Sequence, residues 1–225
     1  MKKQGVMYAQ TEIFHVSDIR YFCVAMSGIA AARVLPAEQA VSEAQATPAE
    51  EKLPDYASGE GVTMIGDSIM SGNRGIILSQ LPNAFIDAKG SRDVCGGFEA
   101  AQRLQAEGNL SDVVIVELGT NGPLLDHEPY ATGTQNLLEL LGTERQIFWV
   151  TTYCSYSQWM RMNNNYIWEL SRTRPNITVI DWYTLASNHR EWFKDGVHPN
   201  MEGARQFAQL LRRSLAAKYD KQSVR

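Results

Sequence analysis

Two stretches of the sequence carry side chains that could act together as a nucleophile and its base. "GVTMIGDSIMSG" (61–72) places Ser68 just after a short apolar run, and "DGVHPN" places Asp195 and His198 three residues apart. A serine hydroxyl is a weak nucleophile until a base takes its proton, and a carboxylate that orients the base completes the arrangement. The three residues therefore predict acyl-group chemistry through an acyl-Ser68 intermediate.

A third stretch, "ELGTNGP" (117–123), ends an apolar run with Asn121 beside a glycine. The side-chain amide of Asn121 can donate a hydrogen bond to a developing oxyanion, and neighbouring glycines let a substrate approach the backbone closely. Taken alone, the stretch is also typical of an ordinary turn. The prediction of an oxyanion donor depends on its occurring together with the other two stretches.

Each of the first two stretches also has a structural interpretation. Ser68 could simply cap the helix that follows it, which is a common role for serine after a strand. Asp195 and His198 could form an ion pair at the entry of the last helix, with Asn200 as its N-cap and Pro199 setting the entry. The combination of all three stretches, in this order, favours catalysis over these alternatives.

The elements that must position these residues alternate between strands and helices. Several strand-length runs lack polar alternation, as strands covered on both faces do, so we expect a parallel sheet between two helical layers. The carboxyl ends of such strands meet at one edge, which would bring Ser68, Asn121 and His198 together. The predicted strands are 62–65, 84–88, 112–119, 146–153 and 177–182, and the predicted helices are 69–81, 98–107, 130–141, 158–173 and 200–219.

Length and charge limit the class of protein. A chain of 225 residues with 44% hydrophobic residues can bury one core of catalytic size. The net charge of -4 and scattered basic residues exclude a nucleic-acid partner. Cys23, Cys95 and Cys154 form no zinc or disulfide pattern, and we expect free buried thiols.

The amino-terminal quarter differs in composition from the rest. We divide the chain into an N-terminal segment (1–35), an Ala/Glu/Pro-rich disordered linker (36–60) and a catalytic domain (61–220). The apolar run 21–32 has 12 residues, fewer than the roughly 17 that span a bilayer. A signal peptide, a remnant membrane anchor and an amphipathic helix packed on the domain are its three interpretations.

Together, "GDSIMSG", "GTNG" and "DGVHPN" resemble the blocks of the SGNH (GDSL-type) hydrolase superfamily, over about residues 61–217. The resemblance implies a three-layer α/β/α sandwich with a five-stranded parallel sheet of order 2-1-3-4-5. It also implies that Ser68 is the nucleophile, His198 the base and Asp195 its orienting carboxylate. Asn121 and the Ser68 backbone N–H would form the oxyanion hole, and no metal or organic cofactor is implied.

One block departs from the family pattern. The family places a further oxyanion donor, usually a glycine N–H, after the second strand, where this chain has "IDAKGSRDV". Either Gly90 or Ser91 fits that place, because the donor is a backbone group. We favour Gly90.

Within the superfamily, "TMIGDSIM", "DAKGSR", "VVIVELGTNG" and "FKDGVHPN" resemble the extracytoplasmic domain of peptidoglycan O-acetyltransferases, which follows an acyltransferase-three membrane domain through a linker. The resemblance implies acetyl transfer from an acyl ester donor to a cell-wall glycan, outside the cytoplasm, by a secreted or membrane-tethered protein. A detached carboxyl-terminal module would depend on a separate membrane acyltransferase for acetyl groups. The alternatives are a carbohydrate or lipid esterase and a non-catalytic glycan-binding module.

Aromatic residues could line a sugar site. Six of them, Trp159, Tyr166, Trp168, Trp182, Trp192 and Phe193, could stack on sugar rings or could pack in the core. For a transferase, we expect Trp159, Trp182 and Trp192 to form walls that keep water from the acyl-enzyme.

Overall fold

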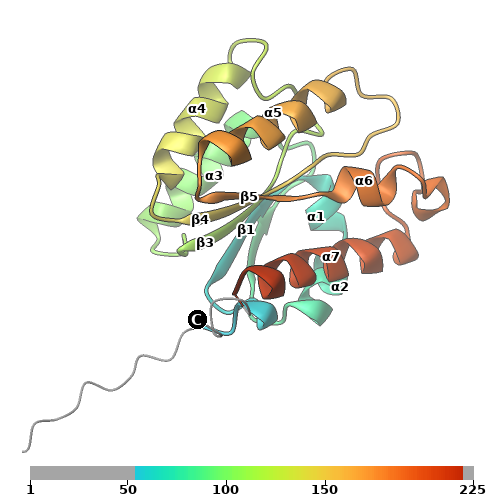
Figure 1. Cartoon of the computed structure of the whole chain (residues 1–225), viewed down its shortest axis with the longest axis horizontal. Helices are drawn as coiled ribbons and strands as arrows, with labels where there is room; N and C mark the ends of the chain where they lie inside the picture. Colours follow the sequence, from blue (N-terminus) through green and yellow to red (C-terminus); the bar gives the residue numbers. More distant parts are fainter. Residues whose placement is uncertain (1–53, 220–225) are drawn as a thin grey trace, which may run out of the picture. The chain divides into compact units, whose positions relative to one another are not determined.

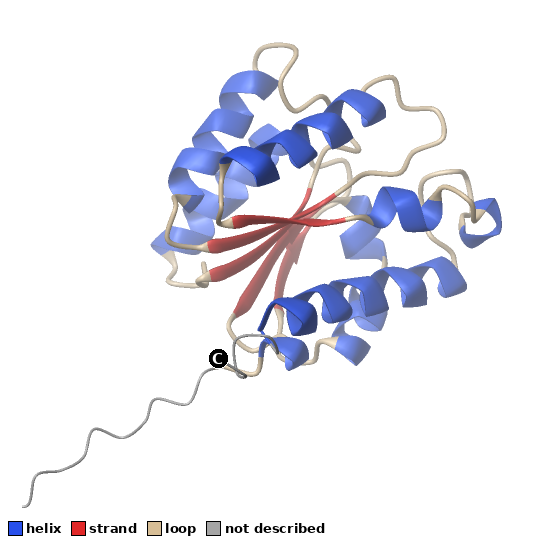
Figure 2. Ribbon diagram, viewed as in Figure 1, coloured by secondary structure: helices blue, strands red, loops and turns tan. Residues whose placement is uncertain are grey.

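The computed structural model of the chain describes residues 54–219, which form an α/β/α sandwich (Figures 1 and 2). All five strands run parallel, in the order β2-β1-β3-β4-β5. The predicted fold and strand order are therefore confirmed. The strands are β1 (Val62–Gly66), β2 (Phe85–Ala88), β3 (Val113–Glu117), β4 (Gln146–Val150) and β5 (Ile177–Ile180).

Helices cover both faces of the sheet (Figure 1). One layer contains α3 (Val94–Ala106), α4 (Tyr130–Leu141) and α5 (Met160–Thr173). The other contains α1 (Ser68–Gly72), α2 (Arg74–Gln80) and α7 (Met201–Tyr219). Between β5 and α7 lie the short α6 (Trp182–Ala186) and the 3-10 turn η2 (Arg190–Trp192).

Successive residues of each central strand serve opposite cores, because side chains in a strand alternate between the two faces of the sheet. Met64 and Phe148 join the core beneath α7, whereas Ile65 and Trp149 join the core beneath α3, α4 and α5. All four side chains are fully buried. Burial on both faces explains why the sequence shows apolar runs here instead of an alternating pattern.

The first predicted helix, 69–81, is two helices in the structure. The break falls at Asn73, whose buried side-chain amide donates to the carbonyl oxygen of Ile69 at 2.7 Å. Such a bond from an asparagine side chain competes with the backbone pattern of a continuous helix. The third helix starts at Val94, four residues before the predicted 98, because Asp93 caps it through the N–H of Gly96 at 2.9 Å.

Part of the predicted linker is ordered. Residues 56–58 form the 3-10 turn η1 (Tyr56–Ser58), and the ring of Tyr56 stacks on Tyr219 of α7 with a centroid distance of 4.0 Å. The predicted segment 1–35 and the remainder of the linker up to residue 53 lie outside the described residues. Among residues 54–219, no helix is both long enough and apolar enough to cross a membrane.

Candidate active site

Ser68 lies in the turn that leaves β1 at the carboxyl edge of the sheet. Asp67 is the N-cap of α1, and its Oδ1 accepts a hydrogen bond from the Ile69 N–H at 2.8 Å. A β-carbon on Gly66 would come within 2.7 Å of the Met70 side chain, so the tight turn needs glycine at that position. Because Asp67 caps the helix, the Ser68 hydroxyl is available for another partner.

That partner is His198, 130 residues further along the chain. His198 Nε2 lies 3.0 Å from Ser68 Oγ, and His198 Nδ1 lies 2.7 Å from Asp195 Oδ2. These distances allow a base to take the serine proton while the carboxylate holds the imidazole ring in the required tautomer. The structure thus brings the three predicted residues into one hydrogen-bonded chain.

The loop that carries Asp195 and His198 is closed on itself. Phe193 and Pro199 pair as an isolated antiparallel bridge, and the Lys194 N–H donates to the His198 carbonyl at 2.9 Å. Gly196 has φ of 87°, a backbone conformation that favours glycine. Asn200 then caps α7, as the structural interpretation of this loop proposed, accepting from backbone N–H groups at 3.0 and 3.1 Å. The cap and the catalytic geometry therefore occur together.

Asp195 is held in its ionised form. Its Oδ1 accepts from the backbone N–H groups of His198 at 2.8 Å and Val197 at 3.1 Å. The backbone and ring hydrogen bonds from His198 lower the pKa of Asp195 to about 2. Its side chain is 52% exposed, so solvent also supports the charge.

Asn121 lies beside the serine turn but already has acceptors for its amide protons. Its Nδ2 donates to Asp67 Oδ2 at 2.9 Å and to the Arg92 carbonyl at 3.2 Å. An oxyanion would have to share or replace the longer of these two bonds. The oxyanion role of Asn121 stays a prediction; the structure shows its side chain hydrogen-bonded to Asp67, the residue before Ser68.

Beneath Asn121 is a buried pair of carboxyl groups. Asp67 and Glu117 are within hydrogen-bonding reach of each other, and the Asp67 N–H donates to Glu117 Oε2 at 3.1 Å. Burial and the charge of Asp67 raise the pKa of Glu117 well above its usual range. Burial raises the pKa of Asp67 as well. Because Asp67 accepts from Ile69 and Asn121, we place the shared proton on Glu117, which donates it to Asp67.

The turn after β2 carries the two candidates for the further oxyanion donor. The Arg92 N–H donates to the Lys89 carbonyl at 3.3 Å, and Ser91, not Gly90, takes the positive φ of 58°. Neither Gly90 nor Ser91 donates its backbone N–H to any acceptor within residues 54–219. The backbone N–H groups of Gly90 and Ser91 therefore remain available as donors. They lie close in sequence to Arg92, whose carbonyl accepts from the Asn121 amide.

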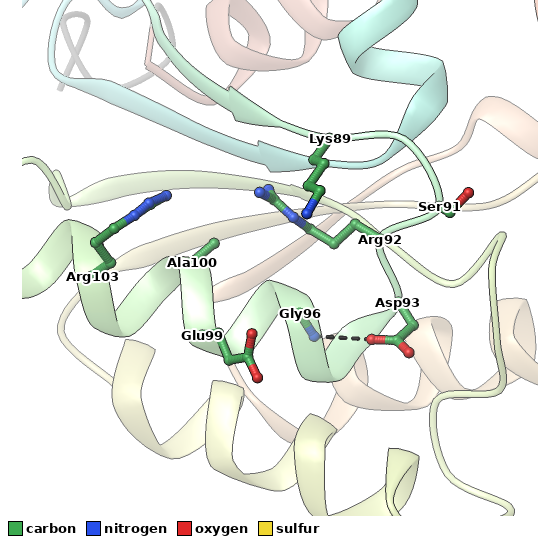
Figure 3. Close-up of a pocket in the computed structure, with 8 residues that line it drawn as sticks. All are labelled: Lys89, Ser91, Arg92, Asp93, Gly96, Glu99, Ala100 and Arg103. Atoms are coloured by element: carbon green, nitrogen blue, oxygen red, sulfur yellow. Dashed lines mark hydrogen bonds between the residues drawn. The ribbon is translucent and has the colours of Figure 1, made fainter.

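Arg92 fixes this turn to the sheet. Its guanidinium donates to the carbonyl oxygens of Gly66 and Asp87 at 3.2 and 2.7 Å, and to Asp87 Oδ1 at 2.6 Å. Arg103 pairs with the other oxygen of Asp87. Burial alone would raise the pKa of Asp87, but the two guanidinium groups outweigh it and lower the pKa. Asp87 therefore offsets part of the charge of Arg92 and Arg103, two of the cations that line the hollow of about 540 Å³ shown in Figure 3.

Comparison with known proteins agrees with the geometry. No protein-family model matches the chain. Over 153 residues, 67% of this chain, it is 31% identical to YrhL of Bacillus subtilis, for which a peptidoglycan O-acetyltransferase activity is proposed. It is 30% identical over 148 residues to the peptidoglycan O-acetyltransferase OatA of Listeria monocytogenes. The chain spans 23% and 22% of these two proteins.

A solved structure shows the same fold. The C-terminal catalytic domain of peptidoglycan O-acetyltransferase A from Streptococcus pneumoniae, solved with a methylsulfonyl adduct, matches with a TM-score of 0.63 at 24% identity. The match covers 72% of this chain and 96% of that domain. At 31% identity over 67% of its length, the chain belongs to the same family as YrhL and OatA. Residues 54–219 share the fold of the SGNH (GDSL-type) hydrolases. An acetyl xylan esterase, at a TM-score of 0.54 and 17% identity, shares the SGNH fold as well.

Two buried asparagines of α5 support the carboxyl edge of the sheet, and none of the recognised motifs contains either of them. Asn163 Nδ2 donates to the carbonyls of Gly119 and Gly122 at 2.8 and 2.9 Å, and its Oδ1 accepts from the Leu124 N–H at 2.8 Å. Asn164 binds the backbone of Thr152 at the end of β4. Asparagine is a poor helix former, so the run "NNN" in a predicted helix was the available signal.

The predicted aromatic walls are only partly present. Trp182 is 1% exposed and packs edge-on against Phe207 in the core, so the prediction that it lines the site was wrong. Trp192 packs against the same core, and its ring stacks on that of Trp182 with a distance of 6.3 Å between the ring centroids. Trp159 is partly exposed, and its indole N–H donates to the Thr120 carbonyl at 3.2 Å, next to Asn121. Of the three, Trp159 borders the active edge, through this hydrogen bond.

Within the described residues, the two cysteines are free thiols, Cys154 buried and Cys95 partly buried. Cys23 lies outside the described residues. Residues 54–219 contain no group of three or more His, Cys, Asp or Glu side chains arranged to hold a metal ion.

Proposed function

We propose that this chain is a serine-dependent O-acyltransferase that moves acetyl groups onto a cell-wall glycan, with Ser68 as nucleophile, His198 as base and Asp195 as the orienting carboxylate. The observation that carries the proposal is the hydrogen-bonded chain of 3.0 and 2.7 Å through these three residues at the carboxyl edge of the sheet. The named activities of the similar proteins support acetyl as the acyl group and peptidoglycan as the glycan.

In the first half-reaction, His198 Nε2 takes the Ser68 proton as Oγ attacks the carbonyl carbon of an acetyl ester. The imidazolium that forms is stabilised by the ionised Asp195. When the tetrahedral intermediate collapses, His198 gives that proton to the leaving alkoxide. The products of this half-reaction are the free alcohol of the acyl donor and acetyl-Ser68.

In the second half-reaction, a sugar hydroxyl loses its proton to His198 Nε2 and attacks acetyl-Ser68. Collapse releases the O-acetylated sugar, and His198 returns the proton to Ser68. If water attacks instead, the products are acetate and free enzyme, which is the esterase alternative. The two outcomes differ only in which hydroxyl reaches the acyl carbon.

The oxyanion of both intermediates needs preorganised donors. We assign these to the Ser68 N–H, the Asn121 side chain and one backbone N–H of the turn at Gly90 or Ser91. Asn121 can release the Arg92 carbonyl, at 3.2 Å, while keeping the shorter bond to Asp67. The bond to Asp67 would then keep the amide aimed at the site.

The acyl donor, the acceptor and the location follow from the similarity and are part of the proposal. We place the domain outside the cytoplasm, where the cell wall is. An acyl ester supplies the acetyl group, delivered by a membrane acyltransferase if one works with this chain. The non-catalytic glycan-binding alternative has no need for the Ser68, His198 and Asp195 geometry.

Covalent labelling tests the nucleophile. Methylsulfonyl fluoride should form an Oγ–S bond with Ser68 and lose fluoride, leaving one methylsulfonyl group on Ser68 by peptide mass spectrometry. Turnover of an activated acetyl ester should fall in parallel. The Ser68→Ala chain should not take the label. Label at other residues with turnover intact would overturn the assignment of Ser68.

Product analysis tests transfer. The full chain, given an activated acetyl ester and chitooligosaccharides, should form acetylated sugar at rates comparable with or above the release of acetate. Rapid acetate release, with no sugar in a broad acceptor panel acetylated, would make the chain an esterase. No ester turnover at all would support the binding-module alternative.

A further inference from the structure

A groove runs along α5 away from the candidate active site. Its first hollow, of about 430 Å³, is lined by Asn121, Trp159 and Met162 among others. A second hollow, of about 620 Å³, shares Gln158 and Met162 with the first. We call these two adjoining hollows the α5 groove. Its inner end is therefore bordered by the residue assigned to the oxyanion hole.

The groove continues along the length of the helix. The second hollow is also lined by Asn165, Trp168 and Arg172. From Met162 to Arg172 an α-helix rises about 15 Å. The groove is thus longer than one sugar ring needs.

The inner end of the groove is rigid. Trp159 cannot turn freely, because its indole N–H is bonded to the Thr120 carbonyl at 3.2 Å. The loop that holds Asn121 is fixed by Asn163, with three hydrogen bonds of 2.8 to 2.9 Å. A ring face and an oxyanion donor are therefore held in a fixed relation, which reduces the ordering cost of binding.

The lining has the chemistry that sugars need. Trp159 and Trp168 offer aromatic faces, and Trp168 is 39% exposed although it is a large apolar side chain. The same lining includes Gln158, Arg161 and Asn165, whose planar amide and guanidinium groups can hydrogen-bond to hydroxyl groups. An acyl chain would leave these polar groups unpaired, so a carbohydrate fits the lining better than a lipid.

We propose that the α5 groove binds a glycan chain of several sugar units and directs one sugar at the inner end toward acetyl-Ser68. This inference rests on the proposed function for the acceptor's role, but the groove can be tested without catalysis. Sugars bound beyond the inner end would hold the reacting hydroxyl near the acyl carbon and raise its effective concentration over water. The enzyme would then favour long acceptors.

Binding can be measured on the full Ser68→Ala chain by calorimetry, with chitohexaose and chitobiose as probes. We expect chitohexaose to bind at least about 10-fold more tightly than chitobiose, because it reaches the outer hollow. Trp168→Ala in this background should remove most of that difference by weakening chitohexaose binding, and Asn165→Ala should reduce it by a smaller factor. Equal affinities of the parent chain for the two probes would overturn the proposal.

The matched control is Phe85→Ala. Phe85 is an aromatic side chain of similar exposure, 45%, at the start of β2, outside the α5 groove. It should leave both affinities unchanged within about two-fold. If Phe85→Ala and Trp168→Ala lower chitohexaose affinity equally, the effect is not specific to the groove and the proposal fails.

A separate measurement distinguishes failure of the groove from failure of the proposed function. Turnover of a small activated acetyl ester by the chain with Ser68 intact does not need the outer hollow. Ester turnover with no preference for long sugars refutes the groove and leaves the proposed function standing. Tight, length-dependent sugar binding without ester turnover refutes the enzyme and keeps the groove.

Discussion

Asp67 and Asp195 support the two sides of the candidate site in opposite surroundings. Asp67 is fully buried, next to a second carboxyl group, and its pKa is raised. Asp195 is 52% exposed, accepts from two backbone N–H groups and the His198 ring, and its pKa is lowered to about 2. The same side chain is thus used in two ways, set by burial and by its hydrogen-bond donors.

The difference shows that Asp67 positions a neighbouring side chain, whereas Asp195 takes part in the chemistry. On the inner side, the protonated Glu117 donates a hydrogen bond to the buried Asp67 carboxylate. Asp67 can therefore stay ionised and accept a hydrogen bond from the Asn121 amide. On the outer side, Asp195 must stay charged to stabilise the His198 imidazolium. Changes on the inner side should therefore act mainly through stability and geometry, whereas changes on the outer side should act on turnover.

The largest effect should come from breaking the chain of hydrogen bonds that joins the two sides. Ser68→Ala and His198→Ala should each lower turnover of an activated acetyl ester by about 10⁴-fold or more. The double variant should lose about as much as either single variant, because the two residues act as one unit. Steady-state kinetics measure this. Additive losses in the double variant would mean that they act independently.

A smaller loss of turnover should follow removal of the Asn121 side-chain amide, which Asp67 on the inner side holds in place. Asn121→Ala should lower turnover by about 100-fold, as loss of one preorganised donor usually does, and should lower the melting temperature by a few degrees, because the buried Asp67 carboxylate loses a donor. Asn83→Ala, an exposed asparagine away from the carboxyl edge, is the control. Unchanged turnover in Asn121→Ala would make this residue structural.

The sequence was sufficient for the sheet and for the hydrogen-bonded residues, but not for the support beneath them. Apolar runs separated by helical segments predicted the five strands, and motif resemblance predicted their order and the roles of Ser68, His198 and Asp195. The motifs are local, so their residues could be recognised without knowing what surrounds them. The proton shared by Asp67 and Glu117, which are 50 residues apart, depends on burial that only the folded chain creates.

The failed predictions have the same origin. Trp182 follows β5 at the active edge, and its position in the sequence therefore favoured the prediction that its side chain lines the site. Phe207 and Trp192 cover it, which depends on how α7 packs against α6. Asn73 ends a helix early through a bond to Ile69, which competes with an otherwise good helical pattern. In each case a specific packing or hydrogen-bond contact overrode the local preference.

Glu117 offers a test of the inner side through stability. A carboxyl group whose pKa is raised by folding stabilises the fold below its unfolded pKa of about 4.3, and that contribution is lost as the pH rises toward the folded value. Glu117→Gln keeps an acceptor for the Asp67 N–H and a donor for its carboxylate, without the ionisation. We expect it to raise the melting temperature at pH 8 by about 2 to 4 °C, corresponding to about 1 kcal/mol in a domain of this size.

The same variant should flatten the dependence of the melting temperature on pH above pH 5. Glu99→Gln, an exposed glutamate on α3, should change neither the melting temperature nor its pH dependence. Scanning calorimetry across pH 5 to 9 gives both quantities. A lower melting temperature for Glu117→Gln at pH 8 would mean that the carboxyl pair is not protonated as assigned here.

The smallest effect is a titration on the outer side. Because the pKa of Asp195 is lowered to about 2, its carboxyl ¹³C shift should stay constant from pH 7 to pH 4 and move only near pH 2. In His198→Ala the ring hydrogen bond is lost, but the backbone N–H of residue 198 still donates, so the pKa should rise only part of the way to the usual value of about 3.9. A full return to that value would assign the shift to the ring alone, and no change would assign it to the backbone alone. Either result would refute the division of the support for the Asp195 carboxylate between the His198 ring and the backbone.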